Sequence, residues 1–437
     1  MVDTAGLRLD QAPPLHLPLR LLLTAPVFAA VAGVLLMVWG DQVFASRWTP
    51  AALAATHLIV IGFLGQAMCG ALLQMLPVVA GAPVPGVRWV APLVHAALAA
   101  GALLVPAGFL GAGSWTLVLG SLSAALGFLV FAGAAAAALA RARGAPATVL
   151  ALRLAVLALV PTVAIGVTLV AALTGWLHLR GFGVWVSTHL TWGLFGWVGL
   201  LILGVAYQVV PMFHVTPAYP RVLVKTLAPV LFAGLLAISL SALSGAGDLA
   251  WMGQGMMALA LALFALATLV LQRGRARPRR DATLLHWWTA LGAGIGAAIG
   301  WWMQAPDLLL GTLLLVGVGV GLPSAMLLKI VPFLCWFHLQ QRQVATGRFE
   351  VRVPHMHALV PEGAARWQWA LHLTALIVLA AASANPRVSA LGGSLLLLAA
   401  LWLGVLLATA AWRYRSLRAA LSVPVEQGQR VRGTGVP

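Results

Sequence analysis

Long apolar segments recur along the whole chain, and most of them continue for 18 or more residues with few charged residues among them. A helix needs about 20 such residues to cross the hydrocarbon core of a bilayer. Backbone polar groups find no water in that core, so these segments are expected to be helical. The pattern predicts about twelve transmembrane helices. Their approximate ranges are 21–39, 51–79, 90–110, 115–139, 154–176, 184–210, 223–243, 249–271, 284–302, 308–333, 367–384 and 390–412.

The composition agrees with this pattern. Hydrophobic residues make up 62% of the 437 residues and charged residues only 8%, which excludes a soluble globular protein. We therefore predict an all-α polytopic membrane protein with one transmembrane domain at 21–413 and the lipid bilayer as its first partner. Tails are expected at 1–20 and 414–437. The first twenty residues lack the short apolar core of a signal peptide.

The basic residues are unevenly distributed between the two sides of the predicted bundle. The two tails and alternate connections hold 22 of the 26 Lys and Arg residues, whereas the opposite side holds only Arg47, Arg180 and Arg387. By the positive-inside rule, both termini are expected in the cytoplasm. Since 24 of the 26 are arginine, as is typical of high-GC bacterial genes, we expect a bacterial inner membrane. The net charge of +17 then reflects topology, and no nucleic-acid partner is predicted.

An internal repeat emerges when the second, sixth and tenth predicted helices are aligned on their last prolines. The aligned segments are QMLP at 74–77, QVVP at 208–211 and KIVP at 329–332. Fifteen residues before these prolines stand Gly62, Gly196 and Gly317, and Gly65 also aligns with Gly199. The repeat predicts three four-helix groups, at about 21–140, 154–272 and 284–412, around a pseudo-threefold axis. The glycines either allow close helix packing or form a flat groove for a large planar cofactor.

Five histidines lie within or at the ends of predicted spans. They are His57, His95, His189, His286 and His372. No Asp or Glu lies in the middle of any span, so these imidazoles should be neutral and should either form hydrogen bonds or bind a metal. His57 and His189, about 7–9 Å below the outer surface, are the preferred ligand candidates, with His95 and His372 as weaker metal candidates.

Three further expectations concern the surroundings of these histidines. His286 should lie near the membrane edge, because Trp287 and Trp288 resemble an interfacial belt. Lys329 should extend its amine toward the aqueous surface. Relative to the aligned prolines, His189 lies two residues further out than His57, which corresponds to about 200° of helix rotation. The two rings therefore need not face one common point.

The segment THLIVIGF at 56–63, within twelve helices in three groups, resembles subunit I of the heme-copper oxidases and nitric oxide reductases. The segment from Ser187 is similar to small oxidase-subunit-I-like proteins of bacteria, and the NnrS family is a more distant relative. The resemblance implies a cytochrome oxidase subunit I-like fold and a heme b bound by His57. His189 would be the second axial ligand or part of a copper site, and Gly62, Gly65, Gly196 and Gly199 would lie beside the cofactor.

Departures from the family pattern limit the functions that the resemblance implies. The predicted helix at 308–333 contains no histidine, and the one at 223–243 lacks the histidine pair that would bind copper. Reduction of oxygen is therefore not expected. The remaining role is electron transfer, nitric-oxide handling or metal handling, with a respiratory or electron-donor protein as partner. The alternatives are a heme-free transporter or permease and an assembly scaffold.

Overall fold

The computed structural model describes residues 11–276 and 279–422, and within these ranges it contains helices and no strand. Eleven helices of these ranges are long and apolar enough to cross a membrane. The all-α, multi-pass class of the protein is thus confirmed. The remaining predicted span corresponds to α15 (Glu362–Ala382), which is helical but is not one of the eleven. Arg366, Gln368 and His372 lower its hydropathy, and the count of twelve stays a prediction.

Several helices differ in extent from their predicted ranges. The helix α1 begins at His16, within the predicted tail, and α16 continues to Ala420. Residues 1–10 and 423–437 of the predicted tails lie outside the described ranges. The other long elements are α2 to α3 (Pro50–Ala80), α4 (Val87–Ala107), α5 (Ser114–Leu139), α6 (Pro146–Leu173), α7 to α8 (Phe182–His214), α9 (Arg221–Ser244), α10 (Gly247–Arg273), α11 (Ala282–Trp302) and α12 to α13 (Asp307–Thr346).

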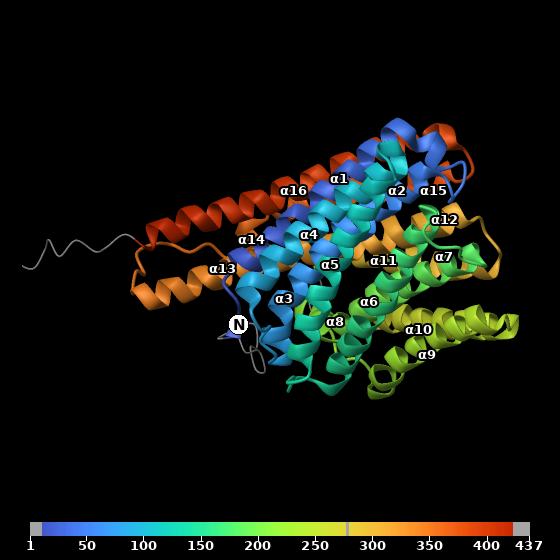
Figure 1. The fold of residues 1–437 in the computed structure, drawn as a ribbon. Helices are drawn as coiled ribbons and strands as arrows, with labels where there is room; N and C mark the ends of the chain where they lie inside the picture. Colours follow the sequence, from blue (N-terminus) through green and yellow to red (C-terminus); the bar gives the residue numbers. More distant parts are fainter. Residues whose placement is uncertain (1–10, 277–278, 423–437) are drawn as a thin grey trace, which may run out of the picture.

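The helices pack in a pattern that recurs three times. In each predicted group the first helix contacts the second, and the third contacts the fourth, as in the pairs α4/α5, α9/α10 and α15/α16. The last helix of each group packs on the first helix of the next, through α5/α6, α10/α11 and α16/α1. The last pair runs side by side along the bundle (Figure 1). These contacts close the three groups into a ring, while the repeat and its pseudo-threefold axis stay a prediction.

The second helix of each group contains an eight-residue π-helical segment. These segments are η2 (Leu58–Gly65), η4 (Trp192–Gly199) and η5 (Leu313–Val320). Each one ends twelve residues before the aligned proline of its helix, so all three occupy the same place in the repeat. Segments of π-helix are rare and are frequent at functional sites. The contact between η2 and η5 joins the second helices of the first and third groups.

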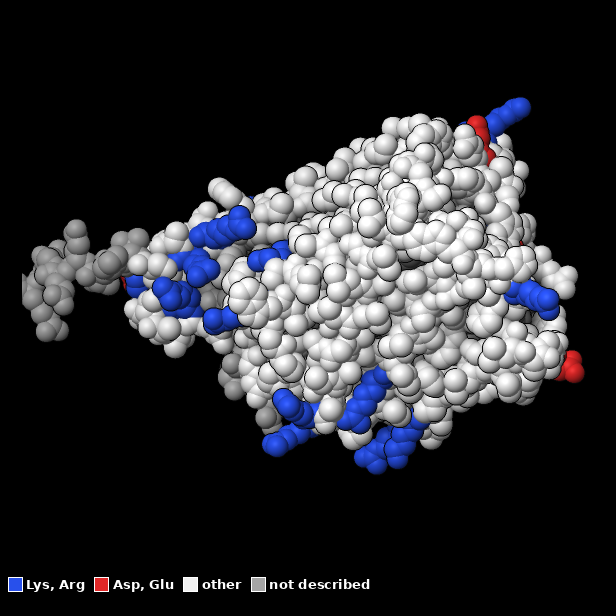
Figure 2. Space-filling model, in the orientation of Figure 1, with Lys and Arg blue, Asp and Glu red and all other residues white. Residues whose placement is uncertain are grey.

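Basic side chains gather at one end of the helices, and few lie at the opposite end (Figure 2). We call the basic end the inner end and the opposite end the outer end. The inner ends of α13 and α16 extend beyond their neighbours (Figure 1). This asymmetry follows the alternation read from the sequence, while the orientation in a bacterial inner membrane stays a prediction.

Candidate functional site

His57 and His189 both lie near the outer end, each as the eighth residue of its helix, α2 (Pro50–His57) or α7 (Phe182–Thr191). Both side chains are partly buried. The Nδ1 atom of His57 lies 2.7 Å from the Leu53 carbonyl oxygen, and that of His189 lies 2.9 Å from the Thr162 carbonyl oxygen. A carbonyl only accepts, so both rings donate through Nδ1 and keep a lone pair on Nε2. Imidazoles that bind metals are held in the same way.

The two rings contact different groups of helices. The His57 ring lies 5.3 Å from the Phe109 ring in η3 (Gly108–Ala112) of the first group, measured between centroids. The His189 ring packs on α6 of the second group, where a Cβ atom at Gly166 would lie 2.9 Å from Cε1.

The two histidines bond to different carbonyls. His57 donates to the Leu53 carbonyl of its own helix, whereas His189 donates to the Thr162 carbonyl of α6 in the second group. The two-residue offset in the alignment corresponds to about 200° of helix rotation, and a common point for the two rings stays a prediction.

The four glycines predicted to lie beside a cofactor contact neighbouring helices instead. A Cβ atom at Gly62 would overlap Phe28, and one at Gly65 would lie 3.1 Å from Cζ of Phe128. In the second group, a Cβ atom at Gly196 would lie 2.9 Å from Cβ of Ala158, whereas one at Gly199 would make an ordinary contact with Leu231 at 3.8 Å. The space next to these glycines is filled by protein, which favours the packing alternative over a groove for a planar group.

The weaker metal candidates, His95 and His372, have different surroundings. The Thr24 hydroxyl donates to the Arg20 carbonyl, so the Nε2 atom of His95, 3.0 Å away, donates to Thr24. His95 thus serves as a hydrogen-bonding link between α4 and α1. His372, in contrast, is buried next to His286, with 5.2 Å between ring centroids. His286 is completely buried and the neighbouring Trp287 is nearly so, which means that they do not form a lipid-facing belt, while the place of His286 near the membrane edge stays a prediction.

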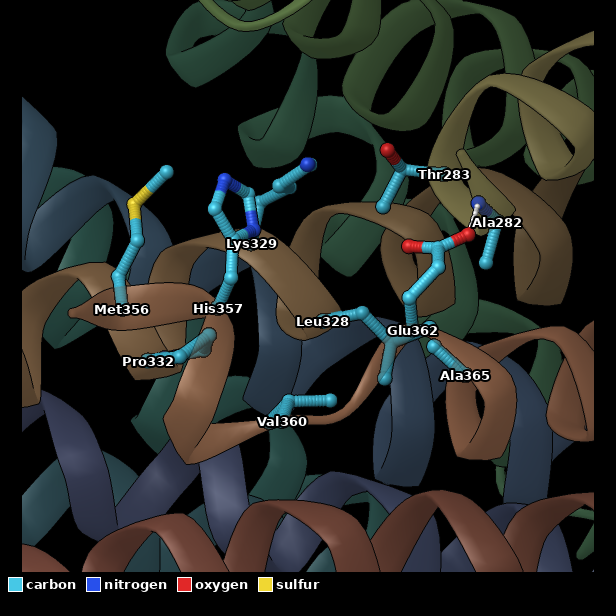
Figure 3. Close-up of a pocket in the computed structure, with 10 residues that line it drawn as sticks. All are labelled: Ala282, Thr283, Leu328, Lys329, Pro332, Met356, His357, Val360, Glu362 and Ala365. Atoms are coloured by element: carbon cyan, nitrogen blue, oxygen red, sulfur yellow. Dashed lines mark hydrogen bonds between the residues drawn. The ribbon is translucent and has the colours of Figure 1, made fainter. Parts of the chain in front are cut away.

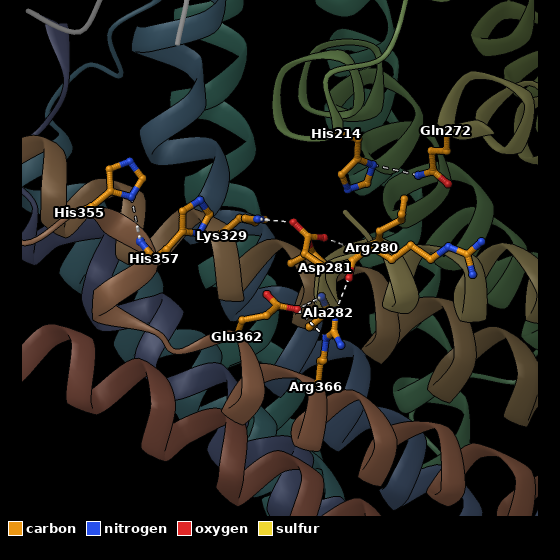
Figure 4. A network of polar contacts seen from close by, with 12 residues as sticks. His214, Gln272, Arg280, Asp281, Ala282, Lys329, His355, His357, Glu362 and Arg366 are labelled. Atoms are coloured by element: carbon orange, nitrogen blue, oxygen red, sulfur yellow. Dashed lines mark hydrogen bonds and ion pairs between the residues drawn. The ribbon is translucent and has the colours of Figure 1, made fainter. Parts of the chain in front are cut away.

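An ion pair at the inner end was missed by the sequence analysis. The Lys329 Nζ atom lies 2.7 Å from Oδ2 of Asp281, and the two side chains are only 8% and 16% exposed (Figure 4). The expectation that Lys329 reaches the surface was therefore wrong. Asp281 also caps α11, because its Oδ1 accepts from the Leu284 amide at 3.0 Å and the Thr283 hydroxyl at 2.7 Å. Burial would raise the pKa of Asp281, but Lys329 and these hydrogen bonds lower it to about 2.

The ion pair has a counterpart in the second group. Gln208, which aligns with Lys329, donates to the Thr148 hydroxyl near the start of α6 at 3.3 Å. In both groups the residue three before the aligned proline is thus joined to the beginning of the first helix. The sequence did contain a signal for this ion pair. Lysine occupies position 329 in the third group, whereas glutamine occupies the two aligned positions, 74 and 208.

A small recess, partly open to the surface, lies beside Lys329 (Figure 3). Glu362 lines it and accepts from the Ala282 amide at 2.8 Å and from Arg366 at 3.0 Å. Above the ion pair, His214 is joined to Gln272 through Nδ1, and its buried Nε2 has no hydrogen-bond partner (Figure 4). This recess combines acidic, basic and imidazole groups at the inner end.

Other metal-binding arrangements are not found in the part of the chain that the structure describes. It contains no group of three or more His, Cys, Asp or Glu side chains that could hold a metal ion. Cys69 and Cys335 are buried and unpaired with each other. His286 and His372 are therefore a neighbouring pair and not part of a larger cluster of such residues in the described ranges.

Comparison with protein-family models finds no match for this chain, and no curated protein matches it. The resemblance to oxidase subunit I thus depends on the motif, the helix arrangement and the histidines themselves.

Proposed function

We propose that the protein binds a b-type heme through His57 and His189 at the outer seam between its first two groups. The observation that carries this proposal is the orientation of the two imidazoles, which both donate through Nδ1 to a carbonyl and keep the Nε2 lone pair available. A heme bound there would supply one-electron transfer. The role would be electron transfer, nitric-oxide handling or metal handling, served by a respiratory or electron-donor protein.

The electrostatic surroundings of the two histidines suit a heme better than a bare divalent ion. All Asp and Glu residues lie outside the middle of the spans, so the rings have no buried acid to offset a metal charge. Placing an uncompensated charge in an apolar interior is costly. The porphyrin carries two negative charges of its own and offsets most of the iron charge. Because the glycine faces are filled, the proposal rests on the histidines and not on a glycine groove.

The test is the dithionite-reduced minus oxidised spectrum of protein purified in mild detergent from cells that make ample heme. Wild type is compared with His57→Ala and His189→Ala, and His95→Ala is the matched control because its ring serves a hydrogen bond to Thr24. We expect b-type bands in wild type and control, and their loss in both ligand variants. Well-folded wild-type protein without heme, or bands that survive both substitutions, would contradict the proposal.

A heme-free transporter is the second candidate, and the inner recess favours it. Lys329, Asp281 and Glu362 place paired charges beside a partly open cavity at the end of the bundle, where a substrate could enter or leave. Buried ionisable groups in membrane proteins commonly mark such pathways. Substrate-dependent uptake by proteoliposomes, lost in Lys329→Met and retained in His57→Ala, would support this candidate. The scaffold alternative predicts neither heme nor uptake.

A further inference from the structure

We propose a second site, independent of the outer histidines, in which His286 and His372 bind one monovalent copper ion. His286 lies one turn into α11 from its inner end, and His372 lies in the middle of α15. Their rings are 5.2 Å apart between centroids, and their side chains are 0% and 1% exposed. The site therefore joins the first and third helices of the third group.

The hydrogen bonds of His286 determine which of its ring nitrogens is free to bind an ion. The Gln368 side-chain nitrogen donates to the Ala399 carbonyl at 3.3 Å, which orients the amide. Its Oε1 atom therefore accepts from Nε2 of His286 at 2.6 Å. With its proton on Nε2, His286 keeps an unshared pair on Nδ1, and that atom is buried with no hydrogen-bond partner. Gln368 thus fixes the protonation and orientation of the His286 ring through a hydrogen bond, as residues that support metal ligands do.

His372 offers the second donor. Neither of its ring nitrogens has a hydrogen-bond partner, although both are buried. Leaving a buried polar atom unsatisfied costs about 1–3 kcal/mol, and such atoms are uncommon in folded proteins. Gly321 of α13 leaves room at this ring, because a Cβ atom there would lie 3.2 Å from Nε2. Ser324, on the same face of α13, is also buried with an unpartnered hydroxyl.

The neutral character of these donors selects the ion. The ligands are two imidazoles, a ligand type that suits copper and zinc. The site has no carboxylate or thiolate among its donors, so the ion keeps its charge in an apolar interior. The desolvation cost grows with the square of the charge, so a divalent ion costs about four times as much as a monovalent one. Cu(I) is therefore expected in preference to Zn²⁺.

The test is an anaerobic titration of the purified full chain with Cu(I) against a chromophoric Cu(I) chelator. We expect one tightly bound ion per chain, with an affinity that falls about 100-fold or more in His286→Ala and His372→Ala. His95→Ala is the matched control, because that ring occupies the corresponding helix of the first group and is bonded to Thr24.

X-ray absorption of the Cu(I)-loaded wild type is the second measurement, and it does not depend on how the variants fold. The proposal predicts low-coordinate copper with nitrogen neighbours and the scattering pattern of imidazole. Sulfur scattering would place the ion at methionine or cysteine and overturn the proposal. Absence of stoichiometric binding, or equal loss in the His95→Ala control, would also overturn it and leave an ordered water as the partner of these nitrogens.

Discussion

Replacing Lys329 with methionine tests the inner ion pair directly. Methionine keeps an apolar stem in place of the lysine side chain but leaves the Asp281 carboxylate without its cation. Removing one partner of a buried pair typically costs about 3–5 kcal/mol. Asp281 is 16% exposed and keeps its hydrogen bonds from Thr283 and Leu284, so we expect the lower end, about 3 kcal/mol.

The double variant Lys329→Met/Asp281→Asn separates the ion pair from other effects of the substitutions. Asparagine is also a good helix N-cap, so α11 should keep its first turn. With both charges removed, we expect a stability within about 1 kcal/mol of wild type. The single variant Asp281→Asn completes the cycle, and the coupling energy should be at least about 2 kcal/mol. Denaturant titration in detergent micelles, followed by circular dichroism, measures each free energy. The exposed Lys225, the only other lysine, provides the control Lys225→Met.

The pH dependence gives an independent check on the same pair. The pKa of Asp281 is lowered from 3.8 to about 2, so its contribution to stability is present above pH 4 and is lost as the pH falls toward 2. In Lys329→Met, loss of the cation should raise this pKa above its wild-type value, because burial still opposes ionisation. That variant should therefore lose less stability than wild type as the pH falls from 4 toward 2. A coupling energy below about 0.5 kcal/mol, with no difference in pH dependence, would refute the reasoning.

Three further predictions concern packing and orientation. Gly393→Val should destabilise the α1/α16 seam by about 3 kcal/mol in denaturant titration, because its side chain would meet the Met37 backbone. Gly133→Ala is the control and should have little effect, because the space at Gly133 is open. Phe28→Ala should cost about 3–5 kcal/mol in the same assay, since this buried ring fills the space at Gly62, and an unchanged midpoint would contradict the packing role. A membrane-impermeant thiol reagent added to intact cells should label Arg387→Cys and not Arg279→Cys, and the reverse would invert the predicted topology.

The apolar runs predicted the helices well, because length and hydropathy alone determine which segments can cross a bilayer. They did not predict where helices end once the chain leaves the apolar region. The helix α13 continues to Thr346, well beyond the predicted limit at residue 333, through a segment rich in polar residues. Hydropathy measures the apolar part of a helix and carries no information about its aqueous extension.

The π-helical segments and the glycines show a second limit. In a run as uniformly apolar as Leu58–Gly65, no polar position marks the helical period, so the wider turn leaves no signal in the sequence. Glycine is suited both to close packing and to a cofactor groove, and only the contact between Gly62 and Phe28 separates these alternatives.

The polar contacts could be predicted only in part. The sequence identified His57 and His189 by type and position, but their hydrogen-bond acceptors are backbone carbonyls, which any residue supplies. Lys329 and Asp281 are 48 residues apart, and Asp281 was assigned to a loop outside the span. Only the packing of α13 on α11 brings their side chains together.

The most direct test of the central claim is the low-temperature electron paramagnetic resonance spectrum of the oxidised protein, recorded with the heme content per chain. If His57 and His189 are the two axial ligands, wild type should contain one heme with a low-spin, bis-imidazole signal. His57→Ala and His189→Ala should each lose the heme or convert it to a high-spin form, while His95→Ala should match wild type. A folded wild-type protein without heme, or a low-spin signal unchanged in either ligand variant, would contradict the account.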